Sequence, residues 1–423
     1  MKAAAAVLLV LTLALVVGCG GDGTYEAVSA TSCGRVVYEG DGEPDVVLVS
    51  DLPLRGVGAA SSRLMVEAIE QVVRQRGFRA GKYRVGYQSC NDTVGDEPFD
   101  ELLCRRNAGA YVATPDVVGV IGPWNSGCAF QQIPIVSRKA AGPLAMLSPS
   151  NTWGGLTRNL PGDPESGDAL YRDGVRSYAR VVPHDLSQGI AAAHLAARLG
   201  ARRVAVLQQN PNKDYARGLA VPFTRAAEDL GLQVRRFTWS LRKSYARLAR
   251  DVASVRPDAV FLAGITQVNA KQLVQDLRSV LGARVALIGP DSFAASGVAQ
   301  ELGQAGEGMH VTEPGIRPAA LPPAGRRLLR RLGLTPKEVE GTWAPEAAQA
   351  AEVLLDAVGR SDGTRSSVVE ELFATKVKDG ILGSFSFDRF GDVVPAPVSM
   401  YRIRHGELVP TGVVRAPLDA INR

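Results

Sequence analysis

The sequence predicts an α/β protein of two lobes, each built on a parallel sheet that is covered by helices on both faces. Two observations favour this fold class. Short apolar runs of strand length alternate with amphipathic helical patterns along most of the chain. The length of 423 residues also exceeds what one hydrophobic core usually organises, which indicates more than one lobe.

Most of the predicted strands are continuous apolar runs, as strands buried on both faces are. They lie at residues 45–50, 83–88, 117–121, 144–147, 203–207, 233–237, 259–263 and 285–288. Helical patterns lie at residues 62–76, 99–111, 129–139, 186–198, 215–229, 244–255 and 267–280. Residues 159–177 are rich in Gly, Pro and Asp, so we expect an exposed insertion there.

The N-terminus predicts export. Met1 and Lys2 precede an apolar run over residues 3–17 that is too short to span a bilayer comfortably, so we expect residues 1–18 to be a signal peptide. The run ends at Gly18 and Cys19 and resembles the lipobox of bacterial lipoproteins, in which the cysteine is lipidated. The alternative is an ordinary signal peptide followed by a chance cysteine. With lipidation at Cys19, residues 19–43 become a tether, and the protein is anchored at the outer face of the membrane in the cell envelope.

Composition and motifs point to a binding protein. Hydrophobic residues make up 46% and charged residues 22%, as in globular proteins, and the net charge of +5 comes from basic residues scattered among acids, so we expect no nucleic-acid partner. Signatures of phosphate-binding loops, dinucleotide-binding loops, zinc proteases and serine hydrolases are absent from the sequence. We therefore expect no enzyme activity and no cofactor.

Four cysteines follow Cys19, namely Cys33, Cys90, Cys104 and Cys128. In an exported protein an even number predicts disulfides, and four cysteines allow three pairings. The histidines lie far downstream and no two cysteines are closely spaced, so the pattern does not favour a metal site.

Two loops of the first half are the candidate ligand site, because open parallel sheets bind ligands beyond the carboxyl ends of their strands. The loop over residues 122–128 carries Ser126, and the loop over residues 148–155 carries Ser150, Asn151 and Thr152. Short polar side chains at helix N-termini can hold a carboxylate. The alternative is that they are ordinary helix caps.

These features occur in a recognisable order. The lipobox, the Val-Ile-Gly-Pro strand end followed by Ser126, the Ser-Pro loop with Thr152, the turn over residues 214–218 with Tyr215, and Gly-Pro followed by Asp291 resemble the Leu/Ile/Val-binding family. These are type I periplasmic binding proteins of ABC importers, and the resemblance runs from about residue 45 to about residue 412. It implies two doubly wound lobes joined by a hinge of three segments. The lobes would comprise residues 44–181 plus 314–394, and residues 182–313 plus 395–414.

The resemblance also implies roles for single residues. Ser126 and Thr152 would bind the α-carboxylate of an amino acid, Asp291 would face its ammonium group, and Tyr215 would close the site from the second lobe.

The sequence departs from relatives at the pocket for the ligand's side chain. Arg55 places a cation near the cleft, unless it is simply exposed, and Thr266 follows a strand where relatives often carry an aromatic residue. Trp124, Trp153 and Trp343 could line the pocket or belong to the core. By the geometry of the family, Cys90 would pair with Cys128, which leaves Cys33 with Cys104.

We expect a monomeric, lipid-anchored protein that captures an amino acid or a similar small polar ligand and presents it to the permease of an ABC importer. The alternative from the same fold is a sensory lipoprotein that binds an amide, a urea-like compound or an aromatic ligand. An enzyme with an unrecognised cleft is the third hypothesis.

Overall fold

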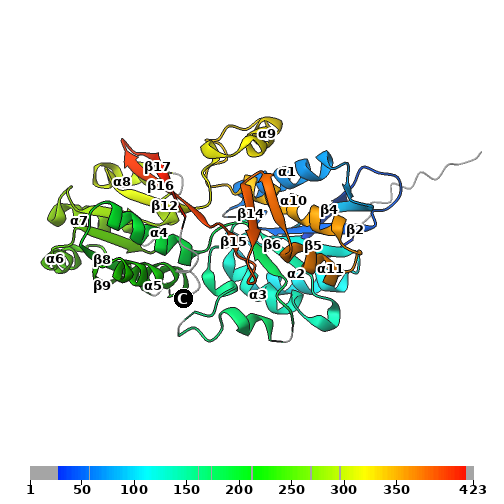
Figure 1. Ribbon diagram of the computed structural model, residues 1–423, viewed down its shortest axis with the longest axis horizontal. Helices are drawn as coiled ribbons and strands as arrows, with labels where there is room; N and C mark the ends of the chain where they lie inside the picture. Colours follow the sequence, from blue (N-terminus) through cyan, green and yellow to red (C-terminus); the bar gives the residue numbers. More distant parts are fainter. Residues whose placement is uncertain are drawn as a thin grey trace, which may run out of the picture.

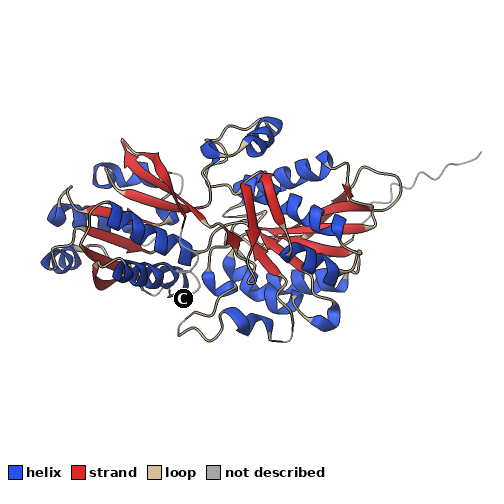
Figure 2. Cartoon of the chain, in the orientation of Figure 1, coloured by secondary structure: helices blue, strands red, loops and turns tan. Residues whose placement is uncertain are grey.

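The structure is a computed structural model that describes residues 27–415, apart from 57, 161, 173, 211–212, 267–268 and 295–296. The predicted signal peptide and Cys19 lie outside the described residues. Within them, no helix combines the length and the apolar composition needed to cross a bilayer. The chain forms two lobes, each around a large sheet (Figures 1 and 2).

The first lobe has a seven-stranded sheet in the order β1-β4-β2-β5-β6-β7, with β3 beside β4. Its strands are β1 (Cys33–Val37), β2 (Val46–Leu52), β3 (Arg79–Ala80), β4 (Tyr83–Asn91), β5 (Val117–Ile121), β6 (Ala145–Ser148) and β7 (Tyr178–Arg180). All pairings from β4 to β7 along this order are parallel, whereas β1 and β3 pair antiparallel with β4.

Helices cover both faces of the first sheet because their apolar residues recur with the helical period. One face packs against α1 (Ala59–Gln75), α10 (Ala344–Arg360) and α11 (Arg365–Phe373), with α9 (Pro323–Leu332) beside α1. The other face packs against α2 (Glu101–Ala113) and α3 (Ser126–Val136). A small antiparallel sheet of β13 (Lys376–Gly380), β14 (Gly383–Phe387) and β15 (Val393–Val394) completes this lobe.

The second lobe repeats the plan with the strand order β17-β16-β12-β11-β10-β8-β9. Its strands are β8 (Arg203–Gln209), β9 (Gln233–Trp239), β10 (Ala259–Ala263), β11 (Ala286–Gly289), β12 (His310–Pro314), β16 (Pro397–Arg404) and β17 (Glu407–Arg415). The helices α4 (Asp185–Arg198) and α5 (Lys213–Asp229) cover one face. The helices α6 (Ala246–Ser254), α7 (Ala270–Leu281) and α8 (Val298–Leu302) cover the other.

The predicted fold class is confirmed: both large sheets are dominated by parallel strands. Strands β5 and β10 have the predicted bounds, and the other predicted strands differ at their ends by one to three residues. Helix α3 begins three residues earlier than predicted, at Ser126, because the Asn125 side chain accepts a hydrogen bond from the backbone N–H of Gly127 at 2.8 Å and caps the helix there.

The first described part of the predicted tether is fastened to the first lobe. Val28 is buried, and the Gln88 side chain hydrogen-bonds both its N–H and its carbonyl oxygen. Cys33 then begins an edge strand beside β4. The predicted exposed insertion over residues 159–177 is also partly wrong, because Leu170 and Tyr171 are buried against the lobe.

The predicted disulfide pairing is wrong. Cys33 pairs with Cys90, and Cys104 pairs with Cys128. Cys33 lies opposite Cys90 in the antiparallel register of β1 and β4, a pairing that the sequence did not reveal because β1 has no apolar run. Cys104 and Cys128 lie on α2 and α3, which pack side by side.

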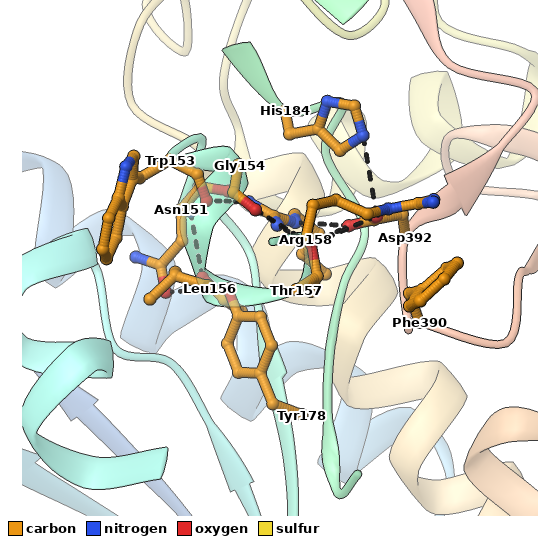
Figure 3. Close-up of polar contacts among 12 residues, drawn as sticks. Asn151, Trp153, Gly154, Leu156, Thr157, Arg158, Tyr178, His184, Phe390 and Asp392 are labelled. Carbon is orange, nitrogen blue, oxygen red and sulfur yellow. Dashed lines mark hydrogen bonds and ion pairs between the residues drawn. The ribbon is translucent and has the colours of Figure 1, made fainter. Parts of the chain in front are cut away.

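The three crossings between the lobes lie at residues 181–184, 315–317 and 395–396. A buried ion-pair network holds the first and third crossings together (Figure 3). Arg180, at the end of β7, is fully buried, and its Nε donates to Asp392 Oδ1 at 2.9 Å. Arg158 Nε donates to Asp392 Oδ2 at 2.7 Å, and its other end pairs with Asp388.

Electrostatics in this network favour a charged Asp392. Burial alone would raise the pKa of Asp392, but the charges of Arg180 and Arg158, joined in acid by that of protonated His184, outweigh it and hold the pKa well below its usual range. His184 is neutral at neutral pH, because burial lowers its pKa to about 4. Its Nδ1 accepts a hydrogen bond from the Ser187 N–H at 3.2 Å, so the proton sits on Nε2, 3.5 Å from Asp392.

We expect the Asp392→Asn variant to lose about 3–5 kcal/mol of unfolding free energy, because it leaves the buried Arg180 charge uncompensated. Since the pKa of Asp392 is lowered by folding, this contribution is present at any pH above 3.8 and is lost only as the pH falls through the lower folded-state value. Urea unfolding at neutral pH measures it. The control is Asp388→Asn, which removes a more exposed pair and should cost about 1 kcal/mol. Equal losses in the two variants would contradict the assignment.

Replacing Cys104 and Cys128 together by Ala should lower the unfolding free energy by about 3 kcal/mol, because the disulfide closes a short loop of the unfolded chain. Mass spectrometry of peptides from the non-reduced protein checks the pairing itself. Peptides joining Cys90 to Cys128 would contradict the pairing described here.

Candidate functional site

A cleft of about 960 Å³ lies between the lobes and is lined from both of them. From the first lobe it receives the loops that follow β5 and β6, with Trp124, Ser126, Ser150, Thr152 and Trp153. From the second lobe it receives the starts of α4 and α5 and the loops after β10 and β11. The residues on that side are Asp185, Tyr215, Ile265, Asp291 and Ser292. The cleft therefore lies at the carboxyl ends of the parallel strands of both sheets, where the topology predicts a ligand site.

The first-lobe wall is rigid because its two loops are hydrogen-bonded to each other. Ser150 Oγ donates to the Trp124 carbonyl oxygen at 2.9 Å. The Asn151 amide donates to the same oxygen at 2.9 Å and to the Pro123 oxygen at 3.0 Å, and its own oxygen accepts from the Tyr178 hydroxyl at 3.0 Å. Asn151 is fully buried and does not line the cleft, so it supports the wall instead of touching a ligand.

The positive end of α3 meets this wall at Ser126, whose Oγ accepts a hydrogen bond from the Trp153 N–H at 3.3 Å. The hydroxyl hydrogen of Ser126 and the backbone N–H groups at the start of a helix are donors that suit an anion. This part of the cleft can therefore accept a carboxylate group.

The second-lobe wall is acidic. Tyr215 Oη donates to Asp291 Oδ1 at 2.6 Å, which fixes the Asp291 carboxylate at the cleft. Asp185 is fully buried, and neither of its carboxylate oxygens has a hydrogen-bond partner within 3.5 Å. Burial raises the pKa of Asp185 well above its usual range, and the Asp291 charge raises it further, while the Thr152 side chain and Arg180 act in the opposite direction. Burial also raises the pKa of Asp291.

Acidic groups dominate the whole lining. The acids are Glu101, Asp163, Glu165, Asp185 and Asp291. Among the described residues that line the cleft, none is Lys, Arg or His. Aromatic side chains supply much of the remaining surface, including Phe99, Trp124, Phe130, Trp153 and Trp343. The cleft can thus surround a small organic ligand that carries a positive charge.

The structure brings five of the eight predicted ligand residues to the cleft, namely Ser126, Ser150, Thr152, Tyr215 and Asp291. Arg55 is exposed and lies outside the lining of the cleft, and the next residue, Gly56 (φ +60°), lies against the backbone of Gly95 and Asp96. Thr266 also lies outside the lining, and its hydroxyl is 3.5 Å from the Ser292 carbonyl oxygen.

The sequence reasoning missed Asp185, the most buried acid of the cleft. Asp185 is the first residue of α4 and follows β7, a strand of only three residues that is too short to appear as an apolar run in the sequence. Its position directly after the first crossing between the lobes, which follows β7, is the feature of the sequence that could have identified Asp185. The acids Glu101, Asp163 and Glu165 were missed because their segments were interpreted as a helix and an exposed insertion.

Comparison with known proteins agrees with this architecture. The leucine binding protein LivK of Thermotoga maritima has a TM-score of 0.68 at 23% identity, covering 88% of this chain and 99% of that one. An ABC transporter substrate-binding protein of Desulfitobacterium hafniense in complex with Leu has a TM-score of 0.68 at 21% identity, covering 86% and 99%. A solute binding protein of Rhodopseudomonas palustris in complex with p-hydroxybenzoic acid has a TM-score of 0.68 at 15% identity, covering 88% and 97%.

At these identities the likeness establishes the fold. A comparison with curated proteins found no match. A family model described as periplasmic binding protein matches residues 52–407, which span both lobes, all three crossings and the cleft. The chain therefore belongs to the periplasmic binding protein family.

Proposed function

We propose that the protein is a lipid-anchored solute-binding protein that captures an amino acid with a neutral or basic side chain and delivers it to an ABC importer. The observation that carries this proposal is that hydrogen-bond donors of the first lobe and the Asp185 and Asp291 carboxylates of the second lobe line the same cleft. Donors at Ser126 and the start of α3 suit an α-carboxylate. The carboxylates of Asp185 and Asp291 suit an α-ammonium group.

A ligand that touches both walls would stabilise the closed state, because the walls belong to different lobes and the crossings between them can act as a hinge. The proposed lobes are residues 44–181 plus 314–394, and residues 182–313 plus 395–414. Lipidation at Cys19 and monomeric behaviour belong to the same proposal and rest on the sequence alone.

An aromatic acid is the second candidate ligand, favoured by the aromatic lining at Trp124, Phe130 and Trp153. The charges oppose it. A benzoate-like anion brings a negative charge into a cleft lined by five acids, and no described Lys or Arg of the lining compensates it. An aromatic amino acid satisfies both the aromatic surface and the acidic wall.

Replacing Asp291 by Asn should weaken amino-acid binding roughly 10- to 100-fold, because a hydrogen bond to a charged group is lost. Isothermal titration with amino acids that raise the melting temperature measures the loss, and 4-hydroxybenzoate serves as the contrasting ligand. The control is Asp229→Asn, which makes the same charge change at the exposed end of α5. The proposal fails if no amino acid raises the melting temperature, or if both variants bind like the wild type.

Binding should also depend on pH through Asp185. The pKa of Asp185 is raised in the free protein, and a bound ammonium group would lower it, so binding releases a proton below the free-state pKa. Affinity should therefore fall as the pH falls. Calorimetry in two buffers of different ionisation enthalpy measures the released proton.

The Asp185→Asn variant should bind more weakly at neutral pH and release no proton at this site. Proton release that is unchanged in this variant would assign the titration to another group.

A further inference from the structure

One segment of the first lobe holds an unusual concentration of positive charge. Between Arg317 and Lys337 the chain has six basic residues and no acidic one. These six charges exceed the net charge of +5 of the whole chain. The expectation that basic residues are scattered evenly among acids is therefore wrong for this segment.

Helix α9 sorts these charges onto one side. At about 100° per residue, Arg326, Arg327, Arg330 and Arg331 fall within an arc of roughly 140°. All four are exposed. The opposite side of the helix holds Gly325, Leu328 and Leu329, which are buried.

The buried side holds α9 close to the lobe. A Cβ added at Gly325 would lie 2.6 Å from the Ile381 carbonyl oxygen, so the helix backbone approaches the chain here more closely than any larger residue permits. In Figure 1, α9 stands out from the body of the protein next to α1. The basic side is thus presented outward on a short helix whose orientation is fixed by packing.

These arginines have few partners within the protein. Among the described residues, no ion pair within 4.0 Å involves any of the four. Arg326 donates to the Leu321 carbonyl oxygen at 2.6 Å. Arg327 lies near enough to Glu352 to offset part of the rise in the pKa of Glu352 that burial causes. Most of the positive charge therefore remains available to an external anion.

A second basic stretch, on the second lobe, lacks this arrangement. It runs from Arg235 to Arg256 and includes Asp251. Arg235 and Arg236 are neighbours on β9, so they point to opposite faces of the strand, and Arg247 and Arg250 lie on a separate element, α6. The stretch has similar charge without one shared face, which makes it a suitable internal control.

We propose that the arginine face of α9 docks on the anionic phospholipid headgroups of the membrane to which the protein is tethered. The proposal rests on the extracytoplasmic location of the family and on the proposed anchor at Cys19. Clustered Lys and Arg side chains bind anionic membrane surfaces through charge alone, without insertion of apolar groups. That suits α9, whose leucines are already buried in the lobe.

The geometry of the tether permits this contact. Cys19 and Cys33 are separated by 14 residues, which span at most about 50 Å. The chain after β1 reaches the last turn of α1, where Glu39 pairs with Arg74. Helix α1 is about 25 Å long and packs against α9. The residues before β1 pack with α2 and α3 on the other face of the sheet, so the length of the tether, and not a shared side of the lobe, lets the arginine face reach the membrane.

The test uses the polypeptide from residue 20 onward, which is the proposed mature chain without its acyl group, and sedimentation with vesicles. We expect binding to vesicles of phosphatidylcholine that contain phosphatidylglycerol, and little binding to phosphatidylcholine alone. Binding should fall steeply between about 50 mM and about 300 mM salt, because screening shortens the range of the attraction.

Replacing Arg327, Arg330 and Arg331 together by Gln should weaken binding to the anionic vesicles on the order of a hundredfold, at roughly fivefold per charge near the surface. Arg326 is kept because of its bond to Leu321. The matched control replaces Arg235, Arg236 and Arg247 by Gln and should stay within about threefold of the wild type. An unchanged melting temperature of each variant shows that folding is intact.

Equal losses in both variants would mean that net charge alone drives binding, and the proposal would be overturned. It would also be overturned if polyglutamate retained the protein through α9 while anionic vesicles did not, since the surface would then suit an acidic polymer or protein. The assay contains no amino acid, so its failure leaves the proposed ligand untouched. Mass analysis of the N-terminus of the exported protein tests the anchor separately.

Discussion

The buried ion pair between Arg180 and Asp392 joins the first-lobe ends of two of the three crossings and anchors the first-lobe wall of the cleft. Arg180 ends the last strand before the first crossing, and Asp392 stands three residues before the third crossing begins. Two charges in such a buried place are tolerable only while they remain paired, so each crossing fixes the position of the other. The same guanidinium reaches the cleft wall, because its Nη1 donates to the carbonyl oxygens of Asn151 at 3.1 Å and of Trp153 at 2.9 Å. The first and third crossings and the first-lobe wall are thus one hydrogen-bonded unit (Figure 3).

This arrangement gives the two walls different properties. The first-lobe wall is held by many internal hydrogen bonds, so its donors are pre-organised and little ordering is left for the moment of binding. The second-lobe wall instead holds two acids, Asp185 and Asp291, whose charged forms repel each other in the absence of a cation. A cationic group between them would remove this repulsion and add an attraction. The energy available for closing the lobes would therefore come mostly from the second wall, and the first wall would determine the position of the ligand.

The sequence predicted those parts of the molecule that local patterns determine. Strands buried on both faces, such as β5 and β10, are recognisable in the sequence as apolar runs. The alternation of these runs with helices predicted the two parallel sheets and the sheet edge where the cleft lies. Features that depend on tertiary neighbours could not be found in this way. Strand β1 is half exposed and forms only because β4 offers a free edge, and its register decides that Cys33 meets Cys90. Asp185 resembles an ordinary first residue of a helix until the second lobe places Asp291 near it.

The local distribution of charged residues also differs from what the net charge of the whole chain suggests. The overall excess of +5 is small, yet the chain separates a cleft lined by acids from a helix that presents arginines outward. The two features are compatible with one function. At physiological ionic strength the field of a charged membrane decays within about 8 Å, so the docking of α9 leaves the ligand preference of the cleft to its own carboxylates. Membrane contact and ligand selection are then carried by two separate charged surfaces of one chain.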